Sequence, residues 1–353
     1  MGEHSAMDRT VGLDVGDRDT HFCILDEAGE ILEEGRFRST RAGLAGRFRN
    51  MPRARVVLEV GALSPWMSRD LEAFGHEVLV ANSYQMGRIY KGQDKTDRHD
   101  AQTLARLGRS DPKLLRPLQH RRSAAMVDRG LLHAREVLVR SRVQLINHVR
   151  GSVKTVGARV SSSGSAQFAK NARPQIPEVL EDALAPILDT IQMLTDQIRA
   201  FDRRIEAVAE QRYPEVEHLR TVHGVGPLTA FAFVLSIDDP ARFAKSRTVG
   251  SYVGLRPKRH QSGDADPQLR ISRAGDPQLR RLLVQCAHYI LGPFGEDSDL
   301  RRFGMRLIDR GGRFARKRAI IAVARKLAVL LHRLWITGEE YEPLRLENRR
   351  RAA

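Results

Sequence analysis

Four acidic residues constrain the fold of this chain more than any other feature of its sequence. Asp14 lies inside the apolar, strand-like run Thr-Val-Gly-Leu-Asp-Val-Gly, and Glu59 lies near the end of a second run, Arg-Val-Val-Leu-Glu-Val-Gly. Asp97 and Asp100 stand three residues apart at the start of a helical pattern, so they share one face of that helix. Two carboxylates about 4 Å apart repel by roughly 4 kcal/mol at an effective dielectric constant of about 20. Such a cluster is stable when a cation, most often Mg²⁺, lies between its members, so the pattern predicts metal-assisted phosphoryl transfer.

The neighbours of these four residues are interpreted differently. A single acidic residue is more often a surface residue, and we assign Asp17, Asp19 and Asp94 to turns and solvent. His99 lies between the two helical aspartates but projects about 100° from each. We therefore expect His99 to support a metal ligand or to contact a phosphate, and not to bind the metal itself.

Charge is unevenly distributed along the chain. The formal net charge is +16 and the isoelectric point about 10.5, so an acidic polymer is the expected partner. Residues 1–100 carry a net charge of −3, whereas residues 241–334 carry +14. This division suits a metal site in an N-terminal domain and a nucleic-acid-binding surface in a C-terminal one.

Cysteine usage and hydropathy exclude several classes of protein. The chain has only two cysteines, Cys23 and Cys286, which excludes a disulfide framework and a cysteine zinc site. The N-terminus has no apolar signal core, and the apolar stretch 319–336 is interrupted by basic residues. We therefore expect a cytoplasmic, nucleoid-associated protein of bacterial type that does not enter a membrane.

Residues 8–118 are predicted to form an α/β domain. The expected strands are 10–15, 21–25, 31–37, 55–60 and 77–80, and the expected helices are 65–74 and 97–108. Three strands followed by strands separated by helices is the order of a ribonuclease-H-type domain.

Residues 119–212 have the pattern of two long helices. One is expected at 124–155, and a loop rich in serine and proline follows it at 161–177. The second carries an apolar seam spaced 4-3-4-3, which is typical of a coiled coil, although Pro186 could kink it. The seam consists of Leu180, Leu184, Ile187, Ile191, Leu194, Ile198, Phe201, Ile205 and Val208. An antiparallel helical hairpin and a dimerisation arm both fit this pattern.

Residues 213–345 are predicted to be mainly helical and basic. Gly226-Pro227 and Asp276-Pro277 each fit the start of a helix. The pentapeptide Asp-Pro-Gln-Leu-Arg occurs at 266–270 and again at 276–280, and we expect two similar junctions between a turn and a helix.

A glycine-rich turn precedes the first of these helices. The segment His-Gly-Val-Gly-Pro-Leu-Thr-Ala, residues 223–230, resembles the turn of a helix-hairpin-helix element. Gly224 and Gly226 would allow backbone N–H groups to approach a phosphate. A plain connection between two helices is the alternative.

Two serines of this region lie among basic residues. Ser262 follows Lys258 and Arg259, and Ser272 precedes Arg273. A serine that attacks phosphorus needs nearby cations to stabilise its alkoxide and the developing negative charge. The residues alone favour a turn hydroxyl for both serines and do not single out a nucleophile.

Taken together, these motifs closely resemble the Piv-like insertion-sequence recombinases, the insertion-sequence one-hundred-and-ten family. The resemblance covers nearly the whole chain, in matching order and spacing. It rests on Gly-Leu-Asp14-Val-Gly, Leu-Glu59-Val-Gly, Lys-Thr-Asp97-Arg-His-Asp100-Ala, Gly-Val-Gly-Pro-Leu-Thr-Ala, Tyr-Val-Gly-Leu-Arg-Pro and Ile-Ser-Arg-Ala-Gly. Members of that family are known as bridge-RNA-guided transposases with a RuvC-like N-terminal domain.

The resemblance implies a function and a division of labour. It implies that the four acidic residues bind Mg²⁺ as a DEDD tetrad, and that a C-terminal serine, Ser262 with Ser272 in reserve, forms a covalent link to DNA. It further implies a homo-oligomer, a dimer or a tetramer, in which the tetrad of one subunit lies near the serine of another. A guide RNA encoded by the element would pair with donor and target DNA. The expected domains are a RuvC-like domain (8–118), a coiled coil (119–212) and a serine-bearing domain (213–345).

Two groups of basic residues are expected to contact nucleic acid. They are Arg256, Lys258, Arg259 and Arg273 near the serines, and Arg313, Arg316, Lys317 and Arg318 further along. Six phosphate contacts would give a log–log salt slope near −5. For the second group, a solvated helix face is an equally weighted alternative.

Three other functions compete with the recombinase. A nuclease that resolves Holliday junctions would use the same tetrad with water as the nucleophile. An actin-like ATPase would need a second glycine-rich phosphate loop and an adenosine site, and the sequence offers neither. An inactive nucleic-acid-binding protein would not need an intact tetrad.

Overall fold

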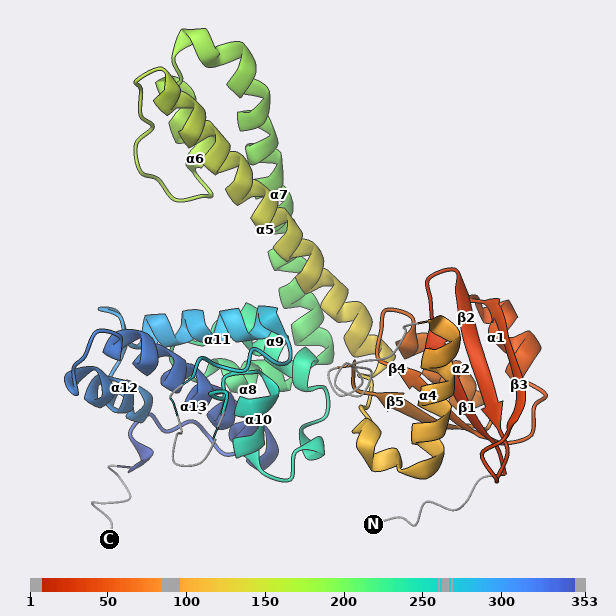
Figure 1. The fold of residues 1–353 in the computed structure, drawn as a ribbon. Helices are drawn as coiled ribbons and strands as arrows, with labels where there is room; N and C mark the ends of the chain where they lie inside the picture. Colours follow the sequence, from red (N-terminus) through yellow and green to blue (C-terminus); the bar gives the residue numbers. More distant parts are fainter. Residues whose placement is uncertain (1–7, 84–95, 260, 262–266, 268, 347–353) are drawn as a thin grey trace. The chain divides into compact units, whose positions relative to one another are not determined.

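A computed structural model describes residues 8–83, 96–259, 261, 267 and 269–346 of the chain. The chain divides into two compact units, of which unit 1 ends at His120 and unit 2 begins at Arg121 (Figure 1). The division into three domains at 118 and 212 stays a prediction.

Unit 1 contains a mixed five-stranded sheet in the order β3-β2-β1-β4-β5. Its strands are β1 (Thr10–Val15), β2 (Asp19–Leu25), β3 (Ile31–Arg38), β4 (Arg55–Glu59) and β5 (Glu77–Ala81). Strands β1, β2 and β3 pair antiparallel, whereas β1, β4 and β5 pair parallel. This is the ribonuclease-H-like order, and all five strands lie where the sequence predicts them.

Helices cover both faces of the sheet. They are α1 (Arg41–Phe48), α2 (Ser64–Ala73) and α4 (Asp97–Ser110). Leu13 packs in the core that α1 and α2 form on one face. Gly12 faces α4, so closely that an added Cβ would lie 2.0 Å from the carbonyl oxygen of Ala101. Because side chains alternate along a strand, Asp14 faces the same side as Gly12, toward α4.

Among the α-helices that the structure describes in unit 1, α1 is the one that the sequence does not predict. Its eight residues include Gly43 and Gly46, which lower helix propensity. The Thr40 hydroxyl nevertheless caps the helix by accepting a hydrogen bond from the Gly43 N–H at 3.1 Å. Burial of Leu44 and Phe48 against the sheet then stabilises it.

Unit 2 begins with two long helices that lie side by side, α5 (Ser123–Thr155) and α7 (Glu181–Arg212) (Figure 1). They form the antiparallel hairpin that was one interpretation of the sequence. Near its tip the short helix α6 (Phe168–Ala172) contributes Phe168 to a core with residues of both long helices.

The buried stripe of α7 differs in part from the predicted seam. The residues that belong to both and are buried are Leu184, Ile191, Leu194, Ile198 and Ile205. The structure also buries Leu188, Thr195 and Ala209, whereas the predicted Ile187, Phe201 and Val208 are only half-buried. The seam was chosen for large apolar residues, but the contact with α5 includes polar pairs, such as Arg142 donating to the Thr195 hydroxyl at 3.2 Å. Pro186 lies inside α7 and is exposed.

The base of the hairpin is tied to the helices that follow it. Tyr213 donates a hydrogen bond to the buried Asp128 carboxylate at 2.8 Å, and Arg212 donates to the same group at 3.0 Å. Arg129 pairs with Asp276 at 2.5 Å. These contacts, all to carboxylates that are buried, fix the base of α5 within unit 2.

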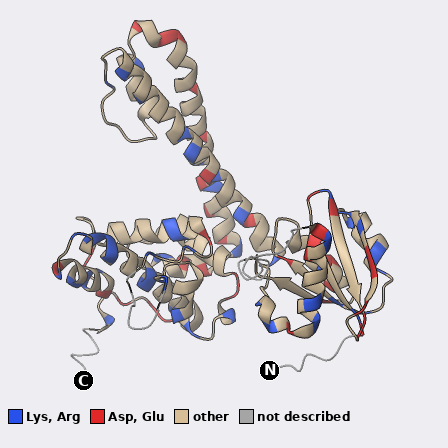
Figure 2. Ribbon diagram, in the orientation of Figure 1, with Lys and Arg blue, Asp and Glu red and all other residues tan. Residues whose placement is uncertain are grey.

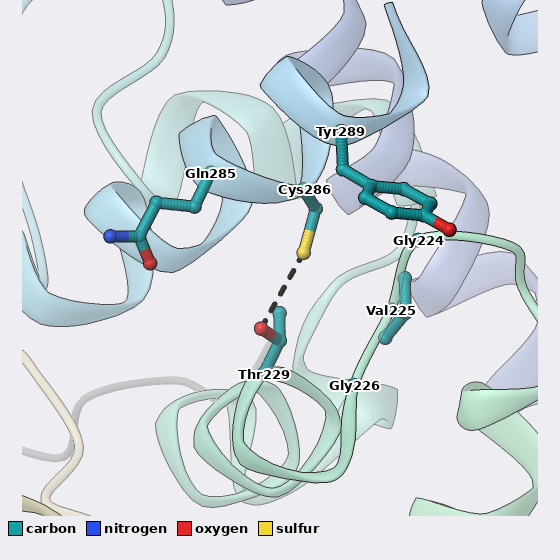
Figure 3. Close-up of a pocket in the computed structure, with 7 residues that line it drawn as sticks. All are labelled: Gly224, Val225, Gly226, Thr229, Gln285, Cys286 and Tyr289. Atoms are coloured by element: carbon teal, nitrogen blue, oxygen red, sulfur yellow. Dashed lines mark hydrogen bonds between the residues drawn. The ribbon is translucent and has the colours of Figure 1, made fainter. Parts of the chain in front are cut away.

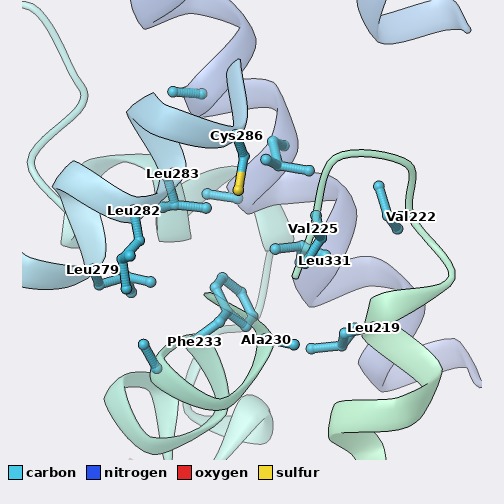
Figure 4. Packing of buried hydrophobic residues seen from close by; sticks show 14 of the residues in the cluster. Leu219, Val222, Val225, Ala230, Phe233, Leu279, Leu282, Leu283, Cys286 and Leu331 are labelled. Atoms are coloured by element: carbon cyan, nitrogen blue, oxygen red, sulfur yellow. The ribbon is translucent and has the colours of Figure 1, made fainter. Parts of the chain in front are cut away.

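The remaining helices of unit 2 surround a single large core (Figure 4). They are α8 (Glu215–Arg220), α9 (Pro227–Ile237), α10 (Val249–Tyr252), α11 (Pro277–Ile290), α12 (Asp299–Asp309) and α13 (Ala315–Thr337). Short 3-10 turns of unit 2 lie at η2 (Arg173–Gln175), η3 (Glu178–Leu180), η4 (Pro240–Arg242) and η5 (Ser246–Thr248), and unit 1 contains η1 (Pro112–Leu115). Helix α9 is at the centre, because every residue from Thr229 to Ile237 is buried. Within the described ranges, no helix has both the length and the apolar character to cross a membrane.

Two predicted helix starts are confirmed and one predicted junction is wrong. Helix α9 begins at Pro227 after Gly226, and α11 begins at Pro277 after Asp276, whose carboxylate accepts from the Gln278 and Leu279 N–H groups. The earlier Asp-Pro-Gln-Leu-Arg copy begins no helix among its described residues. Ile271, directly after it, instead bridges to Pro257 in extended conformation.

Candidate metal centre and nucleic-acid surface

The acidic residues of unit 1 gather around the end of β1. Asp14 lies near the carboxyl end of that strand, and Glu59 ends the adjacent parallel strand β4. Both side chains line a cavity of about 220 Å³ together with the loops that follow their strands. On the face toward α4, the Thr96 hydroxyl caps the helix, which places Asp97 and Asp100 in its first turn.

His21 is brought to the same place by the β1–β2 hairpin. In the antiparallel register it lies directly opposite Asp14. The potential ligand atoms of Asp14, His21 and Asp97 all lie within 4.8 Å of one another. The His21 Nδ1 atom is 3.6 Å from a carboxylate oxygen of Asp97. Glu59 and Asp100 stand outside this group of three.

Electrostatics nevertheless link all four acidic residues. Burial raises the pKa of Asp14 to about 6, and the negative charges of Asp97, Asp100 and Glu59 contribute to that rise, while His21 lowers it. Asp14 is therefore at the centre of the cluster. Asp100 is buried and Asp97 is exposed, so the cluster extends from the protein interior to solvent.

The other titratable residues near the cluster lie outside the group of three. Asp17 is exposed, Asp19 pairs with Arg38 at 3.5 Å, and His99 is half-buried. Asp94 lies outside the described residues.

In unit 2 the glycine turn leads into α9 beside a shallow pocket of about 430 Å³ (Figure 3). Gly224 has a φ of +86°, and an added Cβ there would lie 3.1 Å from the Tyr289 ring. This close approach to α11 requires a glycine whether or not a phosphate binds. Gly226 caps α9 and has open space around it. Cys286 lines the same pocket and donates to the Thr229 hydroxyl at 3.5 Å; like Cys23, it is a buried free cysteine.

The segments that flank the candidate serines pair with each other. The Lys258 N–H donates to the Arg270 carbonyl at 2.9 Å, and the Ser272 N–H donates to the Arg256 carbonyl at 2.8 Å. The side chains of Arg256, Lys258 and Arg259 are exposed on one segment, and that of Arg273 on the other. Ser262 lies outside the described residues.

The reserve candidate, Ser272, makes a local contact. Its hydroxyl accepts a hydrogen bond from the Ala274 N–H at 3.4 Å. Arg273 between them has a φ of +57°, so the segment turns sharply here. This is the behaviour of a turn hydroxyl.

The second basic group lies exposed around the start of α13. It comprises Arg313, Arg316, Lys317 and Arg318, and Figure 2 marks Lys and Arg positions in blue along the ribbon of the C-terminal helices. Phe314 is 52% exposed and has the Arg313 and Lys317 cations 5.3 and 5.8 Å from its ring centroid. These cations are in solvent, where they can meet phosphates.

Comparison with known proteins decides the family. Residues 11–157 match a transposase model named for its DEDD acids and IS110, and residues 216–297 match the model described as "Transposase IS116/IS110/IS902 family". A putative transposase of Sinorhizobium fredii is 30% identical over 304 residues, which are 83% of this chain and 76% of that protein. The chain belongs to the IS110/IS116/IS902 transposase family.

Other bacterial relatives agree with this assignment. The transposase for insertion sequence element IS1111A of Coxiella burnetii is 27% identical over 345 residues, 94% of this chain and 91% of the relative. The pilin gene-inverting protein of Moraxella bovis is 26% identical over 264 residues, 72% of this chain and 71% of the relative. As a transposase, the chain is an enzyme of DNA phosphoryl transfer, and its family implies DNA binding.

The DEDD domain of the transposase implies a metal-ion cofactor, and the residues at β1 fit one. They offer carboxylate oxygens and an imidazole nitrogen from three different elements. Burial and the charges of the neighbouring carboxylates raise the pKa of Asp14, and a divalent cation would relieve the repulsion between the carboxylates.

Sequence reasoning about the transposase missed His21. The signal that could have found it is the short connection between β1 and β2. Val15 pairs with Thr20 beside that turn, so Asp14 must meet His21 in the next pair of the antiparallel ladder. The strand predicted at 21–25 rests on its apolar residues alone, which do not indicate the register with β1.

Proposed function

We propose that this transposase cuts and rejoins DNA through a metal-bound DEDD tetrad and a serine nucleophile. The tetrad is formed by Asp14, Glu59, Asp97 and Asp100, and Mg²⁺ is the proposed ion. The observation that carries the proposal is the placement of Asp14, which shares a cavity with Glu59 and lies within ligand distance of Asp97. Burial, and then the charges of Asp97, Asp100 and Glu59, raise its pKa.

Each element of unit 1 has a distinct task in this mechanism. Strands β1 and β4 hold Asp14 and Glu59 side by side, and the capped first turn of α4 presents Asp97 and Asp100. When bound, Mg²⁺ supplies positive charge that stabilises the attacking and leaving oxygens at phosphorus. The sheet and the capped first turn of α4 would hold the four carboxylates in place before DNA binds.

The proposed nucleophile is Ser262, with Ser272 in reserve. The serine Oγ would lose its proton and attack phosphorus, a P–O bond of the DNA would break, and the released strand would carry away a hydroxyl end. Attack of another hydroxyl on the phosphoserine would then rejoin the DNA and restore the serine. Arg256, Lys258 and Arg259 would stabilise the negative charge at phosphorus. The turn contact of Ser272 favours Ser262.

Rejoining is favoured over simple cleavage by one comparison. The Moraxella relative is named a pilin gene-inverting protein, and inversion requires that every cut strand be rejoined. The runner-up, a Holliday-junction-resolving nuclease, would use the same tetrad with water and would leave no protein on DNA.

A guide RNA and a homo-oligomer complete the proposal. The basic surface of unit 2, with the glycine turn at Gly224 and Gly226, would bind DNA and the RNA. Ile187, Phe201 and Val208 on α7 are half-buried, and Ile187 and Val208 also pack against the cores of unit 2. Their exposed parts would contact another hairpin. A dimer or tetramer built in this way would bring the tetrad of one subunit to the serine of another.

The test is a covalent trap. The transposase is incubated with Mg²⁺, DNA of the element ends and the structured non-coding RNA expected beside its reading frame, and is then denatured. We expect DNA-linked protein from the wild type and from Ser165→Ala, a control at an exposed serine of the hairpin loop. Ser262→Ala should abolish the adduct and Ser272→Ala should retain it.

Other outcomes would point elsewhere. Full strand exchange by both serine variants would overturn the serine mechanism, and Mg²⁺-dependent cleavage without an adduct would favour the nuclease. Binding without any cleavage would indicate an inactive protein. Equal activity with and without the RNA would remove the guide from the proposal.

A further inference from the structure

A histidine that belongs to no DEDD tetrad lies within the candidate metal centre. His21 faces Asp14 across the β1–β2 ladder, and its Nδ1 atom is 3.6 Å from the Asp97 carboxylate. This distance exceeds that of a direct hydrogen bond, about 2.7–3.2 Å. The two groups therefore face each other without being bonded.

The spacing of the three side chains fits a shared ion. Ligand atoms around a six-coordinate ion, each about 2.1 Å from it, lie about 3.0 to 4.2 Å apart. The ligand atoms of Asp14, His21 and Asp97 lie within 4.8 Å of one another, so small side-chain movements would bring all three to one ion.

The backbone around His21 is held on both sides. Strand β2 lies between β1 and β3, and His21 pairs with Asp14 on one side and with Arg36 on the other. The preceding residue, Thr20, is buried and hydrogen-bonds Ser39 at 2.8 Å. The His21 side chain is 29% exposed, so its position is largely set by the fold.

We propose that His21 is a nitrogen ligand of the metal ion and that it selects for Mn²⁺ over Mg²⁺. Mg²⁺ takes oxygen ligands almost exclusively, whereas imidazole is a good ligand for divalent transition metals. Exchanging one oxygen ligand for an imidazole therefore weakens Mg²⁺ binding relative to Mn²⁺. This inference rests on the proposed metal centre and adds a residue and a metal preference to it.

The experiment measures metal binding directly, without DNA. Tag-free, full-length protein is titrated with Mn²⁺ and with Mg²⁺ by isothermal titration calorimetry at pH 7. We expect the wild type to bind Mn²⁺ more tightly. In His21→Ala the Mn²⁺ affinity should fall about 10-fold or more, and the Mg²⁺ affinity much less, so the preference is lost. His148→Ala, at an exposed histidine of α5, should change neither.

A spectroscopic signature separates a ligand from a residue that only positions Asp97. Bound Mn²⁺ in the wild type should show electron spin-echo modulation from an imidazole nitrogen, and the modulation should vanish in His21→Ala. Circular dichroism of the metal-free variant checks that it folds.

Three results would overturn the assignment. Mn²⁺ bound to the wild type without nitrogen modulation would show that His21 is not a ligand. Equal losses of Mn²⁺ and Mg²⁺ affinity in His21→Ala would make His21 a positioning residue for Asp97. Failure of the wild type to bind either ion would reject the metal centre itself, and with it the proposed function.

Discussion

At the scale of single residues, Asp14 is the acid of the cluster whose ionisation is most clearly disfavoured by burial and by the neighbouring carboxylates. Its pKa is raised from 3.8 to about 6, so the folded state holds this proton more tightly than the unfolded state does. Ionisation of Asp14 therefore lowers the stability of the metal-free protein as pH rises from about 4 to 6, and the full loss is present above that range. After allowance for solvent screening, the loss is about 1–2 kcal/mol.

Asp14→Asn removes that ionisation and keeps the size of the side chain. We expect the metal-free variant to be about 1–2 kcal/mol more stable than the wild type at pH 8 and equal to it near pH 4, as measured by urea unfolding. Added Mg²⁺ should stabilise the wild type and not the variant. A wild type that is the more stable of the two at pH 8 without metal would contradict the raised pKa.

Individual site residues were predictable to different degrees. The four acids could be found from sequence because each stands in an unusual local context, an acid inside an apolar run or a pair at helical spacing. His21 could not be found in this way, since its meaning depends on which residue lies opposite it in the sheet. The close packing of Gly224 could not be found from sequence either, because the α11 ring that it approaches lies far along the chain.

At the scale of elements, local signals gave helix starts, and tertiary packing decided the rest. Asp276-Pro277 specifies a helix start locally, since the Asp276 carboxylate accepts from the next turn. The same pentapeptide ten residues earlier does not begin a helix, because its last residue and the one after it pair with the 256–258 segment. Which residues of α7 are buried likewise depends on the side chains of α5 that contact them. The sequence pattern of α7 alone therefore cannot predict the buried stripe.

The helical hairpin allows the predicted seam of α7 to be compared with the stripe that the structure buries. Leu188 belongs to the buried stripe and is 1% exposed in the tip core, whereas the adjacent Ile187 belongs to the predicted seam and is half-buried. Leu188→Ala should destabilise the tip by about 2–5 kcal/mol through lost burial and a cavity. Ile187→Ala should cost about half as much or less. Hydrogen exchange of the α7 amides measures both, and a larger effect of Ile187→Ala would restore the predicted seam.

At the scale of the whole molecule, sequence reasoning was most reliable. Strand positions in unit 1 follow from five runs of β-favouring residues, and the family assignment follows from motifs that match in order over nearly the whole chain. The net charge of +14 over residues 241–334 belongs to unit 2, whereas the acidic excess of residues 1–100 lies within unit 1. Electrostatics therefore predict that unit 2 dominates the affinity for nucleic acid.

Salt dependence tests that prediction on the intact protein. If six cations of unit 2 meet DNA phosphates, the log–log slope of the binding constant against salt should be about −5. Replacing Arg313, Arg316 and Lys317 by alanine should weaken binding uniformly across sequences and reduce the slope to about −3. Replacing three exposed arginines of unit 1, Arg36, Arg49 and Arg53, is the matched control and should leave the slope unchanged. If both triple variants keep the wild-type slope, the cations at the start of α13 form a solvated helix face, and the phosphate contacts must come from the Arg256–Arg273 region.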